Sequence, residues 1–470
     1  MLFTSIEFLF LFLPIAMAGY FMLPFRWGLK NYWLLAASLL FYAWGEPTFV
    51  FVMLGSIVFN YLAALAVAHL RTGKAARLAL GVSIAGNLAV IGLWKYANFF
   101  TATLRGWFPS LQGMIPQTSF VLPIGISFFT FQAMSYVVDV YRGDVKVQRN
   151  PFKLALYIAL FPQLIAGPIV LYSTVCEQIE CRRTTLDLFA RGIMRFLYGF
   201  NKKMLLANLF AVVADKAFGM SDPGCCMAWL GAICYTLQIY FDFSGYSDMA
   251  IGLGMVFGFR FLENFDYPYI SRTVTEFWRR WHMSLGTWFR DYVYFPLGGS
   301  RVGTLKLIFN LAVVWTLTGV WHGANWTFIL WGALYGVLIT VEKLFSLPRR
   351  VDENVLLQTG YRIFTLFAVV LGWVLFRAEN LSSAGGYLKA MFCGSAGSTP
   401  DLAAYQFGEI ALVMAVGICL STPLVRDFRN RFERSGAVAA LDGFVQLALF
   451  ACGISYLVIS AYNPFIYFNF

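Results

Sequence analysis

The chain has 470 residues, of which 59% are hydrophobic and 13% are charged. Soluble domains carry about 25% charged residues, so this composition excludes an ordinary soluble protein. Apolar runs of about 20 residues, the length of a membrane-spanning helix, recur along the chain and predict an all-α polytopic membrane protein. The net charge of +11 does not indicate nucleic-acid binding, because the basic residues of the N-terminal part collect in alternate loops between these runs.

The N-terminal third contains five apolar runs, which predict membrane spans near 5–24, 31–44, 48–70, 78–100 and 119–141. The loops after the first, third and fifth runs hold nine Lys and Arg residues, against one after the second and fourth. By the positive-inside rule, this asymmetry places the N-terminus outside the cytoplasm. The first run lacks a basic start and a small-residue cleavage site, which predicts a retained span rather than a signal peptide.

The middle of the chain is less regular. Pro162, Gly167 and Pro168 interrupt the apolar segment 154–172, which predicts a kinked or re-entrant segment. Segment 186–217 carries Arg191, Arg195, Lys202 and Lys203 along an otherwise apolar helix, as expected at a membrane interface or beside a hydrated cavity. Further spans are predicted near 225–258, 305–320, 326–345, 361–378, 406–424 and 437–461, which makes about eleven.

Only three histidines occur in the chain, and two of them follow a tryptophan. His322 follows Trp321 inside a long apolar stretch, with Asn325 just after it. A full charge at membrane depth costs about 2.5–3.5 kcal/mol or more, but histidine avoids most of this cost by staying neutral. Neutral imidazole is also the form that acts as a general base. A lone histidine of this kind is more often a polar packing residue, and His69, at the end of a span, is expected to be interfacial.

The other Trp-His pair, Trp281-His282, lies in the segment 259–301, which mixes six arginines with four acidic residues, four tyrosines and three tryptophans. The spacing of Glu276 with Arg280, and of Trp278 with His282, predicts shared helix faces. Two roles fit this segment equally well. One is an amphipathic anchor at the interface, and the other is a basic mouth that leads a phosphate-bearing ligand toward a buried histidine.

The run RRWHMSLGTWFRDYVYFPLGGSR, followed by WTLTGVWHGANWTFILWG, resembles the signature of membrane-bound O-acyltransferases, in particular their alginate O-acetyltransferase (AlgI-like) branch. The segments MLFTSIEFLFLFLP, VLPIGISFFTFQAMSYVVDVYRG and FPQLIAGPI support this resemblance. It covers a core of about 1–380 within a single domain, 1–470, and leaves the C-terminal helices 381–470. The resemblance implies a ring of about eleven tilted transmembrane helices with re-entrant segments and a central tunnel, in the bacterial inner (cytoplasmic) membrane.

The resemblance makes His322 the buried catalytic histidine, which we expect to be the general base. His282 becomes the second histidine of the family, toward the cytoplasmic side, and we expect it to act by positioning. The substrate-binding residues that we expect around them are Trp281, Arg279, Arg280, Trp321 and Asn325, the last two as oxyanion donors. The chain has no Gly-x-Ser-x-Gly elbow or Cys/His pair, so direct transfer from an acyl thioester, such as acetyl-CoA, is expected without metal or bound cofactor.

The acceptor implied by the resemblance is an exported exopolysaccharide such as alginate. A membrane chain without a soluble domain has little surface to grip a long glycan, so we expect it to relay acetyl groups to a periplasmic SGNH-type acetyltransferase. Three alternatives remain open from the sequence. They are a polysaccharide-precursor transporter or flippase using Asp242, Asp248 and His322, a haem protein with His282 and His322 as axial ligands, and a non-catalytic membrane subunit of an exopolysaccharide complex.

Overall fold

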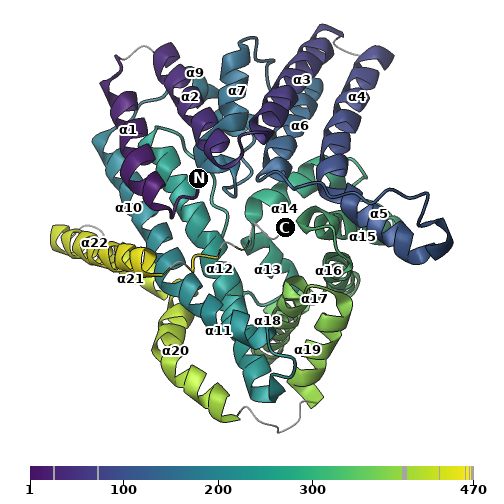
Figure 1. The fold of residues 1–470 in the computed structure, drawn as a ribbon, viewed down its shortest axis with the longest axis vertical. Coiled ribbons are helices and arrows are strands. Elements are labelled where there is room, and N and C mark those ends of the chain that lie inside the picture. The colour runs from purple at the N-terminus through teal and green to yellow at the C-terminus, as the bar shows by residue number, and fades with distance from the viewer. Residues whose placement is uncertain are drawn as a thin grey trace. The chain divides into compact units, whose positions relative to one another are not determined.

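The computed structural model describes residues 1–24, 27–70, 73–393, 400–432, 435–460, 462–464 and 466. Every regular element within these ranges is a helix (Figure 1), which confirms the predicted all-α class. The helices belong to two compact units, one formed by Met1–Phe196 with Asp248–Leu262 and the other by Leu197–Ser247 with Glu263–Phe470.

The first unit contains, in chain order, η1 Phe8–Phe12, α1 Leu13–Met22, α2 Trp27–Gly45, α3 Phe49–Leu70, α4 Lys74–Ile91, η2 Gly92–Tyr96, α5 Ala97–Trp107, η3 Pro109–Leu111, α6 Ile126–Arg142, α7 Pro151–Ala159, α8 Phe161–Leu164 and α9 Tyr172–Glu180, where η marks a short 3₁₀- or π-helical element. Two longer helices, α10 Leu186–Lys202 and α12 Gly224–Val256, have residues in both units. The break between α7 and α8, where Leu160 has φ −55° and ψ 111°, outside the helical region, confirms that the segment 154–172 is not one continuous helix.

The second unit contains η4 Lys203–Ala207, α11 Asn208–Phe218, η5 Pro268–Ile270, α13 Val274–Arg280, α14 Met283–Phe289, η6 Arg290–Tyr294, α15 Thr304–His322, α16 Trp326–Leu344, α17 Leu347–Glu353, α18 Val355–Arg377, α19 Leu381–Cys393, α20 Pro400–Leu420, α21 Leu424–Arg431 and α22 Gly436–Ile459. The helices α15 and α16 follow each other almost directly. They make the most extensive helix pair of this unit, and both carry residues of the site described below.

Eight helical stretches of the described chain are long and apolar enough to cross a membrane. They correspond to eight of the eleven predicted spans, and the remaining three predictions fall on Phe8–Met22, α2 and α6. The helix α6 begins only at Ile126, after a left-handed Gly125, and its 17 residues are shorter than the predicted span. The stretch Lys74–Trp107 is instead longer than predicted, with 34 residues in one run.

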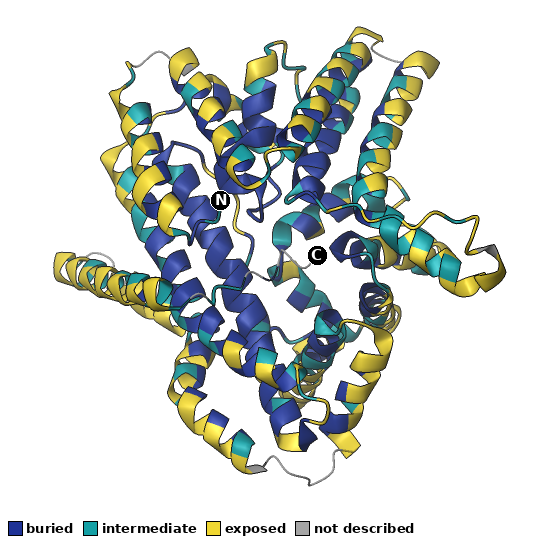
Figure 2. Cartoon of the chain, in the orientation of Figure 1, coloured by how far each residue is buried: buried dark blue, intermediate teal, exposed yellow. Residues whose placement is uncertain are grey.

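Burial differs widely among these spans (Figure 2). Residues inside the protein make up 78% of the apolar window of α12 but only 6% of that of α22. Large apolar side chains such as Leu441, Phe444 and Ile459 are therefore exposed on α22. In a water-soluble protein such a surface would promote aggregation, whereas a lipid bilayer solvates it. The exposed apolar surface thus agrees with a multi-pass membrane protein.

Two glycines allow α15 and α16 to approach closely. A Cβ atom at Gly319 would lie 2.4 Å from the carbonyl oxygen of Phe328, and one at Gly332 would lie 2.4 Å from that of Trp315. Real Cβ atoms do not make contacts this short, so both positions require glycine for this crossing. The close crossing brings the end of α15, which carries His322, against α16.

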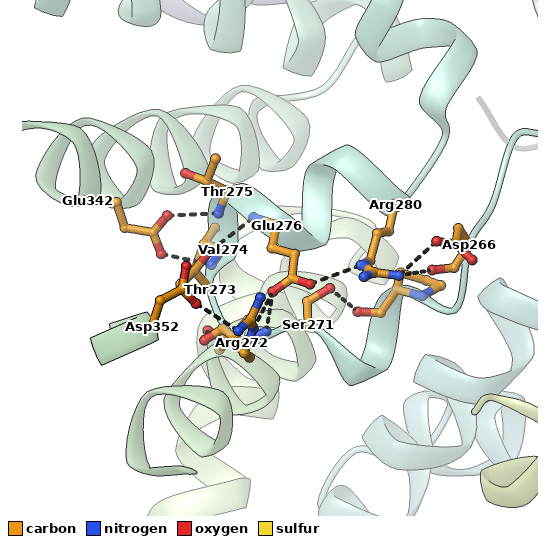
Figure 3. Close-up of polar contacts among 12 residues, drawn as sticks. Asp266, Ser271, Arg272, Thr273, Val274, Thr275, Glu276, Arg280, Glu342 and Asp352 are labelled. Carbon is orange, nitrogen blue, oxygen red and sulfur yellow. Dashed lines mark hydrogen bonds and ion pairs between the residues drawn. The ribbon is translucent and has the colours of Figure 1, made fainter. Parts of the chain in front are cut away.

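A buried carboxylate fixes the start of α13 (Figure 3). Glu342, a fully buried residue of α16, accepts hydrogen bonds from the backbone N–H groups of Val274 and Thr275, both at 2.8 Å. The hydroxyl of Thr273 accepts a third, from the N–H of Glu276, at 3.1 Å. Carboxylates are favoured at helix N-termini, where N–H groups lack partners within the helix. Glu342 therefore anchors α13 to α16.

We expect Glu342→Ala to reduce the free energy of unfolding by about 2 kcal/mol or more, because two buried N–H groups lose their acceptors. Thermal unfolding in detergent would measure the loss. The matched control is Glu353→Ala, which removes an exposed carboxylate paired with Arg349 four residues away. Such exposed pairs contribute about 0.5 kcal/mol or less, so equal losses in the two variants would contradict the anchoring role.

Candidate active site

His322 lies in an aromatic environment at the last turn of α15. Its side chain is buried, with 5% of the residue exposed. The centroid of its imidazole lies 4.9 Å from that of Trp321, 5.0 Å from that of Trp331 and 5.1 Å from that of Phe376. His69, by contrast, is exposed at the end of α3. The imidazole of His322 is therefore enclosed by aromatic rings from α15, α16 and α18.

His282 lies at a break between two short helices. The helix α13 ends at Arg280, and His282 adopts a left-handed conformation, with φ 44° and ψ 54°, directly before α14. Positive φ is uncommon for residues other than glycine. The N–H of Met283, the first residue of α14, donates to the backbone carbonyl oxygen of Asn264 at 2.9 Å and not to a residue of α13. The predicted helix face shared by Trp278 and His282 is therefore wrong, because the chain leaves the helix before it reaches His282.

The indole of Trp321 links the two buried histidines. Its ring centroid lies 5.9 Å from that of His282, in addition to its contact with His322. His282 also packs edge-on against Phe243, at 4.6 Å between centroids, and is 2% exposed. Forty positions separate the two histidines in the sequence, and the structure brings both onto one side chain.

Further tryptophans extend this aromatic cluster. Trp281 packs against Trp373 at 4.8 Å between ring centroids, and Trp278 against Trp331 at 5.3 Å. Trp331 and Trp373 in turn contact Phe376. Of these aromatic residues, Trp281 is predicted from the sequence as a site residue, whereas Trp278, Trp331, Trp373 and Phe376 are not. In the sequence, these residues are indicated only by the many aromatic residues of their segments. Their contacts join three separate helices, α13, α16 and α18, and a contact between distant segments is not visible in the sequence.

The arginines of segment 259–301 differ in how far they are neutralised (Figure 3). Arg280 donates through Nε to Glu276 at 3.1 Å, as its spacing predicts, and through Nη1 to Asp266 at 2.8 Å. Arg272 pairs with Glu276 as well. Arg279 is exposed and forms no ion pair with any residue that the structure describes. Of the two arginines expected to bind substrate, only Arg279 therefore keeps its charge available.

Asn325 caps a helix. Its side-chain oxygen accepts from the N–H of Thr327 at 3.1 Å, which closes the N-terminus of α16. Its side-chain nitrogen donates to the carbonyl oxygen of Glu379 at 2.6 Å. Both polar atoms are thus engaged in holding α16, although the sequence analysis selected this residue as an oxyanion donor.

Two of the alternative functions meet structural obstacles. A haem held by both histidines needs a porphyrin plane between two imidazoles, whereas His282 and His322 both pack against the indole of Trp321. The carboxylates proposed for a transport pathway are paired. Asp242 lies 2.6 Å from the Nζ of Lys203 in the second unit, and Asp248 lies 2.6 Å from Nη2 of Arg195 in the first.

Comparison with known proteins identifies the family. Residues 146–376 match MBOAT, the membrane-bound O-acyltransferase family. The chain is 43% identical to the probable alginate O-acetylase AlgI of Pseudomonas putida and 41% identical to that of Azotobacter vinelandii, in both cases over 100% of each chain. It is 36% identical to the peptidoglycan O-acetyltransferase of Helicobacter pylori, over 83% of this chain and 80% of that protein.

The matched segment contains His282, His322 and the tryptophans around them. The resemblance predicted from the motifs is confirmed over the full length of the relatives. The chain therefore belongs to the membrane-bound O-acyltransferase family, is similar to its alginate O-acetylase branch, and is a multi-pass membrane O-acyltransferase.

Proposed function

We propose that this acyltransferase moves acetyl groups from a cytoplasmic thioester, acetyl-CoA, for the O-acetylation of an exported polysaccharide such as alginate. The observation that carries the proposal is the pair of buried imidazoles, His282 and His322, in contact with one indole. The relatives that align over the whole chain bear the name alginate O-acetylase, which supports alginate as the acceptor.

His322 is the general base in this proposal. As the acceptor hydroxyl oxygen attacks the thioester carbonyl, the imidazole takes the hydroxyl proton. The tetrahedral intermediate then expels the thiolate, which receives that proton, so that an ester and a free thiol result. Base catalysis of this kind contributes about 10²–10⁴ in rate. The aromatic walls formed by Trp331 and Phe376 support the exclusion of water, which would otherwise hydrolyse the thioester.

Trp321 and His282 have supporting roles. The indole N–H of Trp321 is our proposed donor to the oxyanion. His282 positions the acceptor by receiving a hydrogen bond from its hydroxyl group. Burial lowers the pKa of His282 to about 3, so its imidazole is neutral at physiological pH and retains a lone pair for this bond.

The donor approaches along the segment that carries Arg279. Phosphate groups of an acyl-CoA are anionic and pair well with guanidinium groups. The positive-inside pattern of the N-terminal loops supports a cytoplasmic position for this segment. The protein thus belongs to the bacterial inner membrane in our proposal, and a periplasmic SGNH-type acetyltransferase receives the acetyl group for the polysaccharide.

We expect His322→Gln to lower the rate of polymer O-acetylation by about 10²–10⁴, the contribution of a general base. Expression and thermal stability in detergent should remain close to those of the unmodified protein. His69→Gln, at an exposed histidine, is the matched control and should keep its activity. Normal acetylation by the His322 variant, measured as acetyl ester on the polymer, would contradict the mechanism.

The two neighbouring arginines should respond differently to charge reversal. Arg279→Glu should raise the KM for acetyl-CoA, more strongly at low salt than at high salt, because an unpaired charge acts through screened electrostatics. Arg280→Glu should chiefly lower stability, because it places a third negative charge beside Glu276 and Asp266. Steady-state kinetics at two salt concentrations and thermal unfolding would separate these effects. Equal changes in KM would show that Arg279 has no special role.

We expect the purified chain, reconstituted with acetyl-CoA and polymer, to acetylate the polymer poorly by itself. Addition of the periplasmic acetyltransferase from the same bacterium should restore transfer of acetyl groups to the polymer. The two proteins should also co-purify from native membranes. The transfer is measured as labelled acetyl ester on the polymer, with acetyl-labelled acetyl-CoA as donor. Efficient acetylation by the single chain would disprove the relay.

A further inference from the structure

Asn264 is a buried asparagine, 1% exposed, in the segment between α12 and α13. Its side-chain Oδ1 faces three groups of the His282 turn. It accepts from the backbone N–H of Ser284 at 3.1 Å and from the hydroxyl of Ser284 at 2.9 Å, and it lies 3.1 Å from Nδ1 of His282. A backbone N–H can only donate, so the Asn264 atom at this position must be the amide oxygen and not the nitrogen.

This arrangement determines which nitrogen of His282 carries the proton. The partners of Nδ1 are the oxygen of Asn264 and, at 3.4 Å, the hydroxyl oxygen of Ser284. The hydroxyl proton of Ser284 is directed to Asn264, so both oxygens face Nδ1 as acceptors. A neutral imidazole has one N–H group, which must then be on Nδ1. The lone pair is therefore on Nε2.

Nε2 of His282 is the atom that remains for a ligand. It is buried, and no residue that the structure describes forms a hydrogen bond with it. Buried polar atoms normally have partners, so a lone pair without one inside an enzyme site indicates a place for a donor from outside the chain. A hydroxyl group satisfies such an atom, whereas a carboxylate or carbonyl oxygen does not.

Asn264 is itself held from two sides. Its side-chain Nδ2 donates to the hydroxyl of Ser247 at 3.1 Å. Its backbone carbonyl oxygen accepts from the N–H of Met283 at 2.9 Å. Together with the N–H of Ser284, which can only donate to Oδ1, these bonds hold the amide with its oxygen toward His282. The left-handed backbone of His282 adds a second constraint, because backbone strain of this kind persists only where surrounding contacts impose it.

We propose that Asn264 is a positioning residue for acyl transfer, which fixes His282 with its proton on Nδ1 so that Nε2 receives a hydrogen bond from a hydroxyl group of the acyl acceptor. The role of the acceptor hydroxyl rests on the function proposed above. Asn264 touches no substrate and acts through the imidazole alone. The bond to one ring nitrogen decides what the other can do.

The surroundings of His282 indicate that Asn264 acts on the tautomer of the imidazole and not on its charge. Its described ring contacts and hydrogen bonds are with Phe243, Trp321, Asn264 and Ser284, none of which is charged. Another titratable group of the cluster is His322, which also contacts Trp321. Burial keeps the imidazole of His282 neutral well below physiological pH, so titration of His282 does not shape the pH profile of the unmodified enzyme.

Nitrogen-15 NMR on the full chain in lipid, with ¹⁵N-labelled histidine, tests the tautomer directly. The chain has three histidines, so His69→Gln and His322→Gln assign the signals by elimination. We expect His282 to show a protonated Nδ1 and an unprotonated Nε2 between about pH 5 and 8, on either side of the ordinary histidine pKa. A proton on Nε2, or a mixture of both tautomers, would overturn the proposal whatever the reaction of the enzyme is.

Variants of Asn264 test the consequence for turnover. Asn264→Leu should lower kcat by about 10–100-fold, as for removal of the outer partner of a functional imidazole, with the KM for the thioester unchanged. Asn264→Asp keeps an acceptor at Nδ1, so it should retain more activity, but its carboxylate stabilises the imidazolium. Its activity should therefore fall more steeply at acidic pH than that of the unmodified enzyme, and recover as the pH rises.

Asn310→Leu is the matched control. Asn310 is a fully buried asparagine of the same unit that donates to the carbonyl oxygens of Leu297 and Gly299, and its loss should leave the tautomer of His282 intact. If Asn264→Leu kept full kcat although His282 no longer carried its proton on Nδ1, the positioning role of Asn264 would be disproved and the proposed function would stand. Full activity of His322→Gln, with the His282 tautomer as expected, would instead disprove the proposed base and leave the Asn264–His282 geometry standing.

Discussion

The contact of one indole with two buried imidazoles is the constraint around which the second unit is arranged. Trp321 touches both His282 and His322, and the next layer is again aromatic. The surroundings of both imidazoles are therefore largely apolar. A single polar group beside such an imidazole therefore has a large influence on which ring nitrogen carries the proton. The amide of Asn264 beside His282 is such a group.

Buried charged groups in the same unit have ion-pair or hydrogen-bond partners. The pair Lys203–Asp242 is almost fully buried, with its atoms 2.6 Å apart, and Asp242 also accepts from the N–H of Ile466 at 2.9 Å. Glu342 is neutralised by helix N–H groups instead of by a cation. Removing a charge from water is tolerated only when such partners exist. The guanidinium of Arg279 differs from these groups, because it is exposed and forms no ion pair with the part of the chain that the structure describes.

The residues of the site lie at helix ends and breaks. His322 ends α15, His282 separates α13 from α14, and Asn264 precedes α13. Side chains inside a helix are committed to one face, whereas a break can turn a side chain and supply backbone groups with free hydrogen-bonding capacity. The anchoring of α13 by Glu342 and the close α15–α16 crossing at Gly319 hold these ends in place without occupying the site.

The sequence by itself determined the helical membrane class, most of the spans and the family, because hydropathy, periodicity and motif order are properties of neighbouring residues. It did not determine which charges stay free, since the pairing of Arg280 with Asp266 depends on how the chain folds back. The hydrogen bond from the Asn325 side chain to the carbonyl oxygen of Glu379 and the joint contact of both histidines with Trp321 have the same origin. The tautomer of His282 was decided only by the tertiary structure, because a proton's place on a ring depends on a partner 18 residues away.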